Sequence, residues 1–238
     1  MVRDTFFADP HHGPLPGLLV GLTVVTGVVD AVSILSLGRV FVANMTGNVV
    51  FIGFAAAGAP GFSLSASLVA LAGFLVGAAA GGLGTRRFGH DRGVLLLGGA
   101  TTELVLVGVA FAIAATVQEP FAVLSRDAIA AVAALAMGVQ NVVARRLAVP
   151  DMTTTVLTMT LTGIVADLRA GSSGWPQLAR RFVAVGAMLA GAVVGAVLVL
   201  QTTSAMALVV AVALLAAVTL GTAVACRQPG TWRGWRVA

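Results

Sequence analysis

A short polar stretch, VANMTGNVVFIG at residues 42–53, interrupts the apolar first half of the chain. Asn44, Thr46 and Asn48 supply amide and hydroxyl groups there, and Gly47 weakens any helix that continues through them. Such residues are typical of the start of a helix, where backbone N–H groups lack partners. Because those N–H groups and the helix dipole attract negative charge, this start favours an anion, or a carboxylate or carbonyl oxygen of a ligand.

A second polar stretch, TTTVLTMTLTGIVA at residues 153–166, is rich in threonine and follows GVQNVV at residues 138–143. The two stretches together provide the residues that we predict to bind a polar ligand. These residues are Asn44, Thr46, Gly47, Asn48, Asn141, Thr155, Thr158 and Thr160. The alternative, that these groups only cap helices and hold them together, stays open from the sequence.

Ionisable side chains inside apolar runs are costly and usually functional. Asp30 lies deep in the first such run and Glu103 deep in the third. We predict that one of these acids carries a coupling proton, since removal from water favours the neutral acid. Asp30 has an equal alternative, a hydrogen bond that shapes the loop of residues 44–48. Arg145 and Arg146 are interpreted mainly as an interfacial anchor, with guidance of an anion as the alternative.

The composition places these groups in a membrane protein. Of the 238 residues, 58% are hydrophobic and 10% are charged, and a soluble domain cannot bury that much apolar surface. The formal charge of +5 is carried by arginine, which is typical of cytoplasmic loops and needs no nucleic acid to explain it. We therefore expect membrane lipid and a small-molecule solute as partners and no nucleic acid. Both a monomer and a homodimer stay open.

No residue pattern indicates a metal site, a cofactor or a catalytic centre. Cys226 is the single cysteine, and the three histidines lack partners at metal-ligand spacing. The sequence has no HExxH, no GxSxG and no paired catalytic residues with supporting context. We expect no metal and no cofactor, and we expect that the protein is not an enzyme.

Six apolar segments reach the roughly 20 residues that a helix needs to cross a bilayer. They are Leu15–Leu37, Phe62–Leu83, Gly93–Val117, Ala128–Val149, Phe182–Leu200 and Ala205–Cys226. The two polar stretches lie in weaker segments, Val40–Gly58 and Thr153–Ala166. The sequence therefore allows eight crossings, or six crossings with two segments that enter the membrane and return on the same side.

The distribution of arginine favours six crossings. Eight crossings would divide the fourteen arginines eight against six between the two sides. Six crossings leave Arg39 and Arg126 on one side and the other twelve on the cytoplasmic side, where positive residues are enriched. We predict an all-α polytopic membrane protein with both termini in the cytoplasm. It has six transmembrane helices and two re-entrant or broken half-helix segments.

The two polar stretches occupy matching positions in two halves of the chain. GVVDAV at residues 27–32 precedes the first, as GVQNVV precedes the second, and the helices that follow carry small residues at four-residue spacing. Such faces let two backbones approach closely in lipid. The matching residues are Gly73, Gly77 and Gly81 in one half and Ala187, Gly191 and Gly195 in the other.

Because each half contains three crossings, the second half begins from the opposite face of the membrane. This predicts two inverted repeats, an arrangement common among transporters. The parts are a cytoplasmic N-terminal tail (1–14), a first repeat (15–117), a second repeat (118–226) and a cytoplasmic C-terminal tail (227–238).

The same motifs resemble those of a known family. VDAVSILSLGRVFVANMTGN (29–48) and GVQNVVARRLAVPDMTTTVLTMTLTG (138–163) are similar to signatures of the bacterial YoaK family, a membrane domain of unknown function (1275). The resemblance covers nearly the whole chain and implies a compact helical inner-membrane protein, with no substrate. Val29 and Met159 stand where the family frequently has tyrosine and glycine, and Met159 leaves less room for a ligand. Matching positions are Asp30, Asn44, Thr46, Gly47, Asn48, Asn141, Arg145, Arg146, Thr154, Thr155 and Thr158.

These features predict a small secondary transporter or facilitator of a polar or anionic organic solute. Its site lies where the two half-helix segments meet near the membrane midplane. The rival prediction is a non-transporting membrane scaffold or assembly protein that uses its glycine faces for contact. A measurement of flux separates the two classes, because a scaffold carries none.

Overall fold

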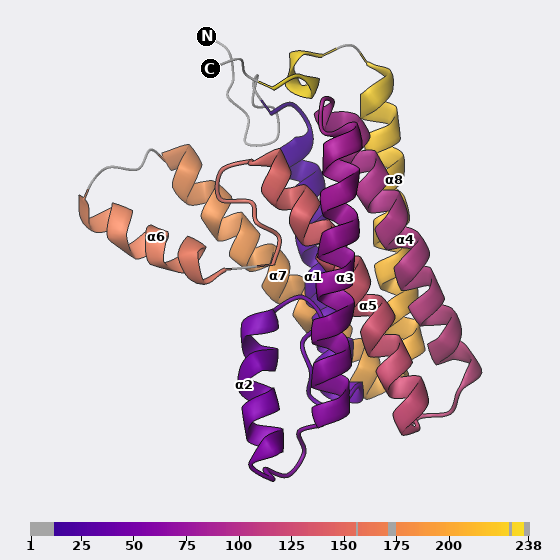
Figure 1. Ribbon diagram of the computed structural model, residues 1–238. Helices are drawn as coiled ribbons and strands as arrows, with labels where there is room; N and C mark the ends of the chain where they lie inside the picture. Colours follow the sequence, from indigo (N-terminus) through magenta and orange to yellow (C-terminus); the bar gives the residue numbers. More distant parts are fainter. Residues whose placement is uncertain (1–11, 156, 171–174, 229, 236–238) are drawn as a thin grey trace.

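The computed structural model describes residues 12–155, 157–170, 175–228 and 230–235, and it is all-helical (Figure 1). These residues form eight α-helices and one short 3-10 helix, η1. The bounds are α1 Leu15–Ser36, α2 Met45–Ala56, α3 Leu64–Phe88, α4 Arg92–Thr116, α5 Val123–Leu147, α6 Thr158–Ala170, α7 Trp175–Gln201, α8 Ser204–Arg227 and η1 Thr231–Arg233. Helices suit lipid because every backbone N–H and C=O group is satisfied within the segment.

Six of these helices, α1, α3, α4, α5, α7 and α8, are long and apolar enough to cross a membrane. This confirms the prediction of six long apolar segments, although α3 and α7 extend past the predicted bounds of theirs. α3 continues through Arg86 and Arg87, and α7 includes Arg180 and Arg181. Arginine marks the membrane surface in a hydropathy pattern, but it is also a good helix former, so the helix continues past it.

Two long crossings hold the bundle together, α3 against α5 and α1 against α7. Glycine lies at both. A Cβ added at Gly77 of α3 would overlap the backbone oxygen of Leu135 in α5. A Cβ added at Gly191 of α7 would overlap the backbone oxygen of Val24 in α1. The small-residue faces read from the sequence therefore lie where two helix backbones touch, as close packing in lipid requires.

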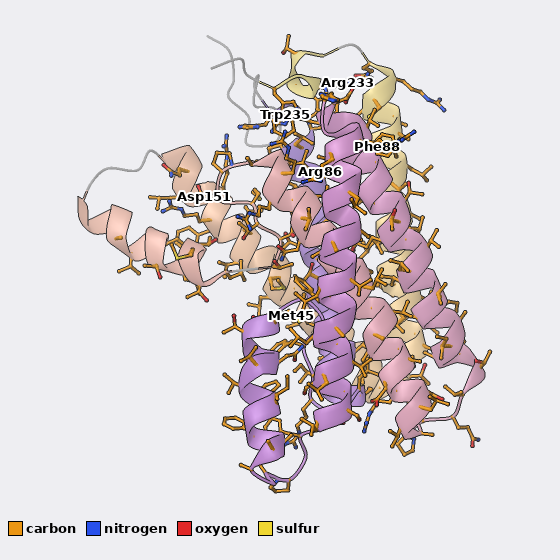
Figure 2. All side chains as sticks on the ribbon, in the orientation of Figure 1. Met45, Arg86, Phe88, Asp151, Arg233 and Trp235 are labelled. Carbon is orange, nitrogen blue, oxygen red and sulfur yellow. The ribbon has the colours of Figure 1, made fainter. Side chains whose placement is uncertain are left out.

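The remaining two helices, α2 and α6, are short, and we call them the half-helices. They contain 12 and 13 residues, or about 20 Å at 1.5 Å per residue, which is less than the roughly 30 Å of a hydrocarbon core. In Figure 1, α2 runs down to the lower end of the molecule, where α1 ends and α3 begins. Met45, its first residue, lies alongside the lower half of α3 (Figure 2).

The second half-helix has a corresponding place at the other end. α5 ends in the upper half of the molecule, the chain then descends, and α6 begins near mid-height and runs outward and upward (Figure 1). α2 packs on α3, and α6 packs on α7. Each half-helix thus packs on the long helix that follows it in the chain.

Arg92, the first residue of α4, is buried and joins three parts of the chain at the upper end. Its guanidinium donates to the backbone oxygen of Leu147 at 2.8 Å and to that of Trp232 at 3.4 Å, and it lies 2.9 Å from His12 Nδ1. Arg92 therefore supplies a hydrogen-bond donor to a carbonyl group at the C-terminal end of α5 and holds η1 against the bundle.

We expect Arg92→Gln to lower the free energy of unfolding by about 2–4 kcal/mol, because it leaves buried carbonyl oxygens without donors. Arg227→Gln is the matched control, since Arg227 is exposed at the end of α8 and should change stability by less than about 0.5 kcal/mol. Thermal unfolding in detergent measures both variants. Equal midpoints for the two would contradict this role of Arg92.

Candidate functional site

The segment between α1 and α2 is held by Asp30. Its carboxylate Oδ1 accepts hydrogen bonds from the backbone N–H of Val42 at 3.3 Å and of Ala43 at 3.2 Å. The sequence left open that Asp30 shapes the loop of residues 44–48 by a hydrogen bond. The structure shows such a contact, but with Val42 and Ala43, just before that loop. It fixes where the chain turns back toward α2. Proton coupling by Asp30 stays a prediction.

Asn48 is completely buried and ties the same segment to the first turn of α2. Its Oδ1 accepts from the N–H of Phe41 at 2.9 Å, and its Nδ2 donates to the carbonyl oxygen of Phe41 at 2.6 Å. Gly47 makes room for Phe41, because a Cβ at position 47 would lie 2.5 Å from the Phe41 ring. These two predicted ligand residues therefore make contacts within the protein.

Asn44 and Thr46 differ from Asn48, because both side chains are exposed. Asn44 occupies the N-cap position of α2 but makes no side-chain cap hydrogen bond. The first backbone N–H groups of α2 are therefore left for another acceptor. In the first half of the chain, Asn44 and Thr46 are the predicted site residues that remain accessible to a ligand.

In the second half of the chain, polar side chains hold the segment before α6 in a similar way. Asn141 of α5 donates from Nδ2 to Thr155 Oγ1 at 2.5 Å, as Asp30 of α1 accepts from Val42 and Ala43. Farther along, Asp151 pairs with Arg181 of α7 at 2.8 Å. A polar residue of the preceding long helix therefore holds the segment before each half-helix.

The segment before α6 has an unusual backbone. Ala148, Asp151 and Thr154 have φ angles of 49°, 64° and 61°, and in the described part of the chain only Arg39 joins them as a non-glycine residue with positive φ. For a β-branched residue such as Thr154 this conformation is disfavoured. Backbone conformations of this kind persist where surrounding contacts hold them, and they cluster at functional sites.

A pocket of about 230 Å³ lies against this segment. It is lined by Asn141, Ala144, Arg145, Ala148, Val149, Met152, Thr153 and Thr155. The structure thus brings together two predicted ligand residues, Asn141 and Thr155. It adds Thr153, which stands in the same threonine run but is not among the predicted ligand residues, and Arg145, which was interpreted mainly as an anchor.

The other predicted ligand residues lie outside this lining. Asn44, Thr46, Gly47 and Asn48 are on or next to α2. Thr158 is exposed at the first position of α6, and Thr160 is buried one half-turn later. The pocket therefore contains predicted ligand residues of the second half of the chain, Asn141 and Thr155, and none of the first half.

Glu103, the other predicted proton carrier, lies in a buried polar cluster. The Gln140 amide, oriented to satisfy all of its neighbours, donates from Nε2 to the Glu103 carboxylate oxygens at 2.7 and 3.2 Å. Its carbonyl oxygen accepts from the hydroxyls of Thr26 and Thr154, each at 2.9 Å. All four side chains are at most 2% exposed. Glu103 was selected from the sequence, whereas the position of Thr26 gave no such signal.

The chain matches a known protein family over most of its length. A family model described as a protein of unknown function (DUF1275) matches residues 18–221. The chain belongs to the DUF1275 family. This confirms the resemblance found in its motifs, and the matched range runs from the first turn of α1 into α8.

One curated relative of this DUF1275 chain is the UPF0700 transmembrane protein YoaK of Bacillus subtilis (strain 168). It is 32% identical over 151 residues, which cover 63% of this chain and 66% of the relative. The alignment thus spans slightly less than two thirds of the relative's length. No solved structure matches the chain. Together with its six candidate spans, these findings identify a multi-pass membrane protein.

We expect Asn48→Leu to lower the free energy of unfolding of this DUF1275 protein by about 2–4 kcal/mol, because the N–H and C=O groups of Phe41 both lose their partner. Asn44→Leu is the control, since the Asn44 side chain is exposed. Denaturant unfolding in micelles compares the two. If both variants unfolded together with the wild type, Asn48 would not be the residue that fixes this loop.

Proposed function

We propose that this DUF1275 protein is a small secondary transporter or facilitator of a polar or anionic organic solute in the bacterial inner membrane. The observation that carries the proposal is the pair of half-helices. The segment that leads into each half-helix is held by a polar side chain of the preceding long helix. Broken backbone at membrane depth is tolerated only where protein buries it or where it lines a wet cavity. Half-helix starts at that depth commonly face the negative groups of transported solutes.

The pattern of helix contacts supports two repeats, residues 15–117 and 118–226, and the three long helices in each half make these repeats inverted. If the halves are repeats, each helix of the first half has a counterpart in the second: α1 and α5, α2 and α6, α3 and α7, α4 and α8. The counterpart of the α3–α5 contact is then the α7–α1 contact. The counterpart of the α4–α5 contact is likewise the α8–α1 contact, and all of these pairs pack in the structure. Gly27 and Gly138 hold matching positions, and each meets backbone atoms of the helix that crosses it.

The arginines support an orientation with the upper end of Figure 1 in the cytoplasm. Arg86, Arg233 and Trp235 lie at that end (Figure 2). Arg39 comes just after α1, and Arg126 lies in the first turn of α5; both of these helix ends are at the lower end of the molecule. Since positive residues are enriched on the cytoplasmic side, we place both termini there, with α2 entering from outside and α6 from inside.

The pocket beside α6 supports an anionic solute. Arg145 offers a guanidinium there. Asn141 keeps a second amide N–H besides the one that it donates to Thr155, and such donors suit a carboxylate. The proposed site combines this pocket with the accessible first-half residues Asn44 and Thr46 across the midplane. Glu103 or Asp30 carries the coupling proton. The proposal assigns the protein no catalytic step and no cofactor.

The rival proposal is a membrane scaffold, and one observation favours it. Asp30 and Asn48 use their polar atoms within the protein, so the first loop keeps its shape without a ligand. A scaffold would need only the glycine crossings and an intact surface. It would give no flux after reconstitution, whatever solute were offered.

The test is uptake of radiolabelled small organic carboxylates into vesicles that contain the purified protein. We expect Arg145→Gln to lower uptake of the best carboxylate by about tenfold or more, because a charge-assisted hydrogen bond is lost. Arg146→Gln is the matched control, since Arg146 is the exposed neighbour outside the pocket lining. Wild-type vesicles without uptake would support the scaffold. Equal uptake by both variants would remove Arg145 from the site.

A further inference from the structure

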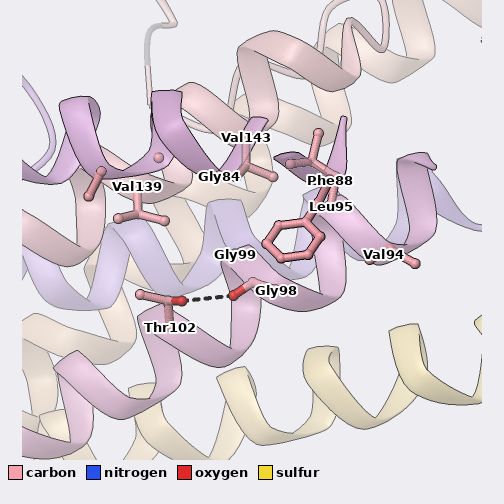
Figure 3. Close-up of a pocket in the computed structure, with 11 residues that line it drawn as sticks. Gly84, Phe88, Val94, Leu95, Gly98, Gly99, Thr102, Val139 and Val143 are labelled. Carbon is pink, nitrogen blue, oxygen red and sulfur yellow. Dashed lines mark hydrogen bonds between the residues drawn. The ribbon is translucent and has the colours of Figure 1, made fainter. Parts of the chain in front are cut away.

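A groove of about 220 Å³ separates α3 from α4, although the two helices are joined by a short turn (Figure 3). Val139 and Val143 of α5 form part of its wall, and glycines line both sides. Gly84 of α3 and Gly98 of α4 have no atom within 4 Å of an added Cβ. The groove is therefore open at these two positions and not closed by neighbouring side chains.

The groove is almost entirely apolar. Thr102 is the polar side chain among its lining residues, and its hydroxyl donates to the backbone oxygen of Gly98 at 2.9 Å, the dashed line in Figure 3. The remaining lining residues are alanine, glycine, valine, leucine and phenylalanine. Polar solutes and water find few hydrogen-bond partners here, so the surface suits an apolar chain.

The end of the groove nearest the α3–α4 turn is basic. Phe88 lines the groove, and the guanidinium carbon of Arg87 lies 5.8 Å from the centre of its ring. Arg86 and Arg87 are both exposed, and Arg86 lies at the same end as Phe88 in Figure 2. The nearby carboxylate of Asp91 is already paired with Arg233 at 2.5 Å. The positive charge of Arg86 and Arg87 is therefore available to an anion.

We propose that this groove is a lipid-binding site, which holds part of one acyl chain of an anionic phospholipid with the phosphate at Arg86 and Arg87. An apolar slot that ends in positive charge matches the two halves of such a molecule, whereas free phosphate would use only the arginines. Anionic headgroups attract basic residues at the membrane surface. The site is separate from the pocket beside α6, so it does not depend on transport.

The first arm of the test fills the groove. Native mass spectrometry measures binding of phosphatidylglycerol and of phosphatidylcholine with the same acyl chains to the purified full-length protein. We expect Gly84→Leu and Gly98→Leu, on opposite walls, to weaken phosphatidylglycerol binding by about tenfold or more, because the leucine occupies space that methylene groups would fill. Gly82→Leu and Gly108→Leu are the controls, since these glycines are equally open but lie outside the lining.

The second arm removes the charge. We expect the wild type to prefer phosphatidylglycerol over phosphatidylcholine by about 25-fold, from roughly fivefold for each of two arginines. Arg86→Gln with Arg87→Gln should abolish this preference. It should weaken phosphatidylcholine binding much less than phosphatidylglycerol binding, because the choline group already neutralises the phosphate charge.

Three results would overturn the proposal. In the first, both groove-filling variants keep wild-type phosphatidylglycerol binding. In the second, the double glutamine variant keeps the headgroup preference. In the third, Gly98→Leu turns an oligomer into a monomer without changing lipid binding, which would make the groove a contact between copies of the chain. Gly84→Leu keeps the first arm decisive if Gly98→Leu does not fold.

Discussion

Gly77→Ala is expected to destabilise the protein by about 3 kcal/mol or more, although it adds a single methyl group, because overpacking at a fixed backbone contact forces both helices to move. The added Cβ would overlap the carbonyl oxygen of Leu135 in α5. A flexible side chain could turn away, but a helical carbonyl cannot. α3 and α5, which share the most extensive helix–helix contact in the bundle, would have to separate and lose dispersion contacts on both sides.

Gly82→Ala is the matched control in the same helix, because no atom lies within 4 Å of an added Cβ there. Alanine has the higher helix propensity, so this variant should be as stable as the wild type or more stable, by up to about 1 kcal/mol. Unfolding in mixed micelles compares the two. We expect Gly191→Ala in α7 to behave like Gly77→Ala, since its Cβ would overlap the carbonyl oxygen of Val24. Equal stability of Gly77→Ala and Gly82→Ala would contradict the close crossing.

Glu103→Leu has the second large expected effect, a loss of about 2–4 kcal/mol, because it leaves the buried amide of Gln140 without its acceptor. Glu103→Gln preserves the shape of the side chain and a carbonyl oxygen for that amide, so the protein should fold with less than half of this loss. The two variants separate the packing role of Glu103 from its charge. Thermal unfolding of both in detergent tests this prediction.

The same variants test the coupling role in vesicles. If Glu103 carries the proton, uptake by Glu103→Gln becomes independent of the outside pH while the wild type stays pH-dependent. Asp30→Asn is the parallel experiment, since its amide oxygen can still accept from the N–H groups of Val42 and Ala43. A pH profile that changes only in Asp30→Asn would transfer the coupling to Asp30. Unchanged profiles in both variants would leave transport uncoupled from protons.

The sequence by itself determined the features that depend on short stretches of chain. Six helices long enough to cross the membrane follow from apolar length, and the short α2 follows from the polar residues that interrupt Val40–Gly58. The matching segments of the two halves, and with them the family, could be recognised because each motif is contiguous. Helix ends were the exception, since arginine ends the apolar pattern but not the hydrogen bonding of the helix.

Only the tertiary structure decided which distant residues meet. Glu103 has no partner nearby in the sequence, and its partner Gln140 reaches it from α5 only because α4 and α5 pack together. The pocket likewise joins Arg145 to Thr153 and Thr155, since the chain reverses direction after α5. The open groove between α3 and α4 exists because consecutive helices need not pack closely along their length. Side-chain contacts of this kind are set by the packing of whole helices, and a local pattern carries no information about them.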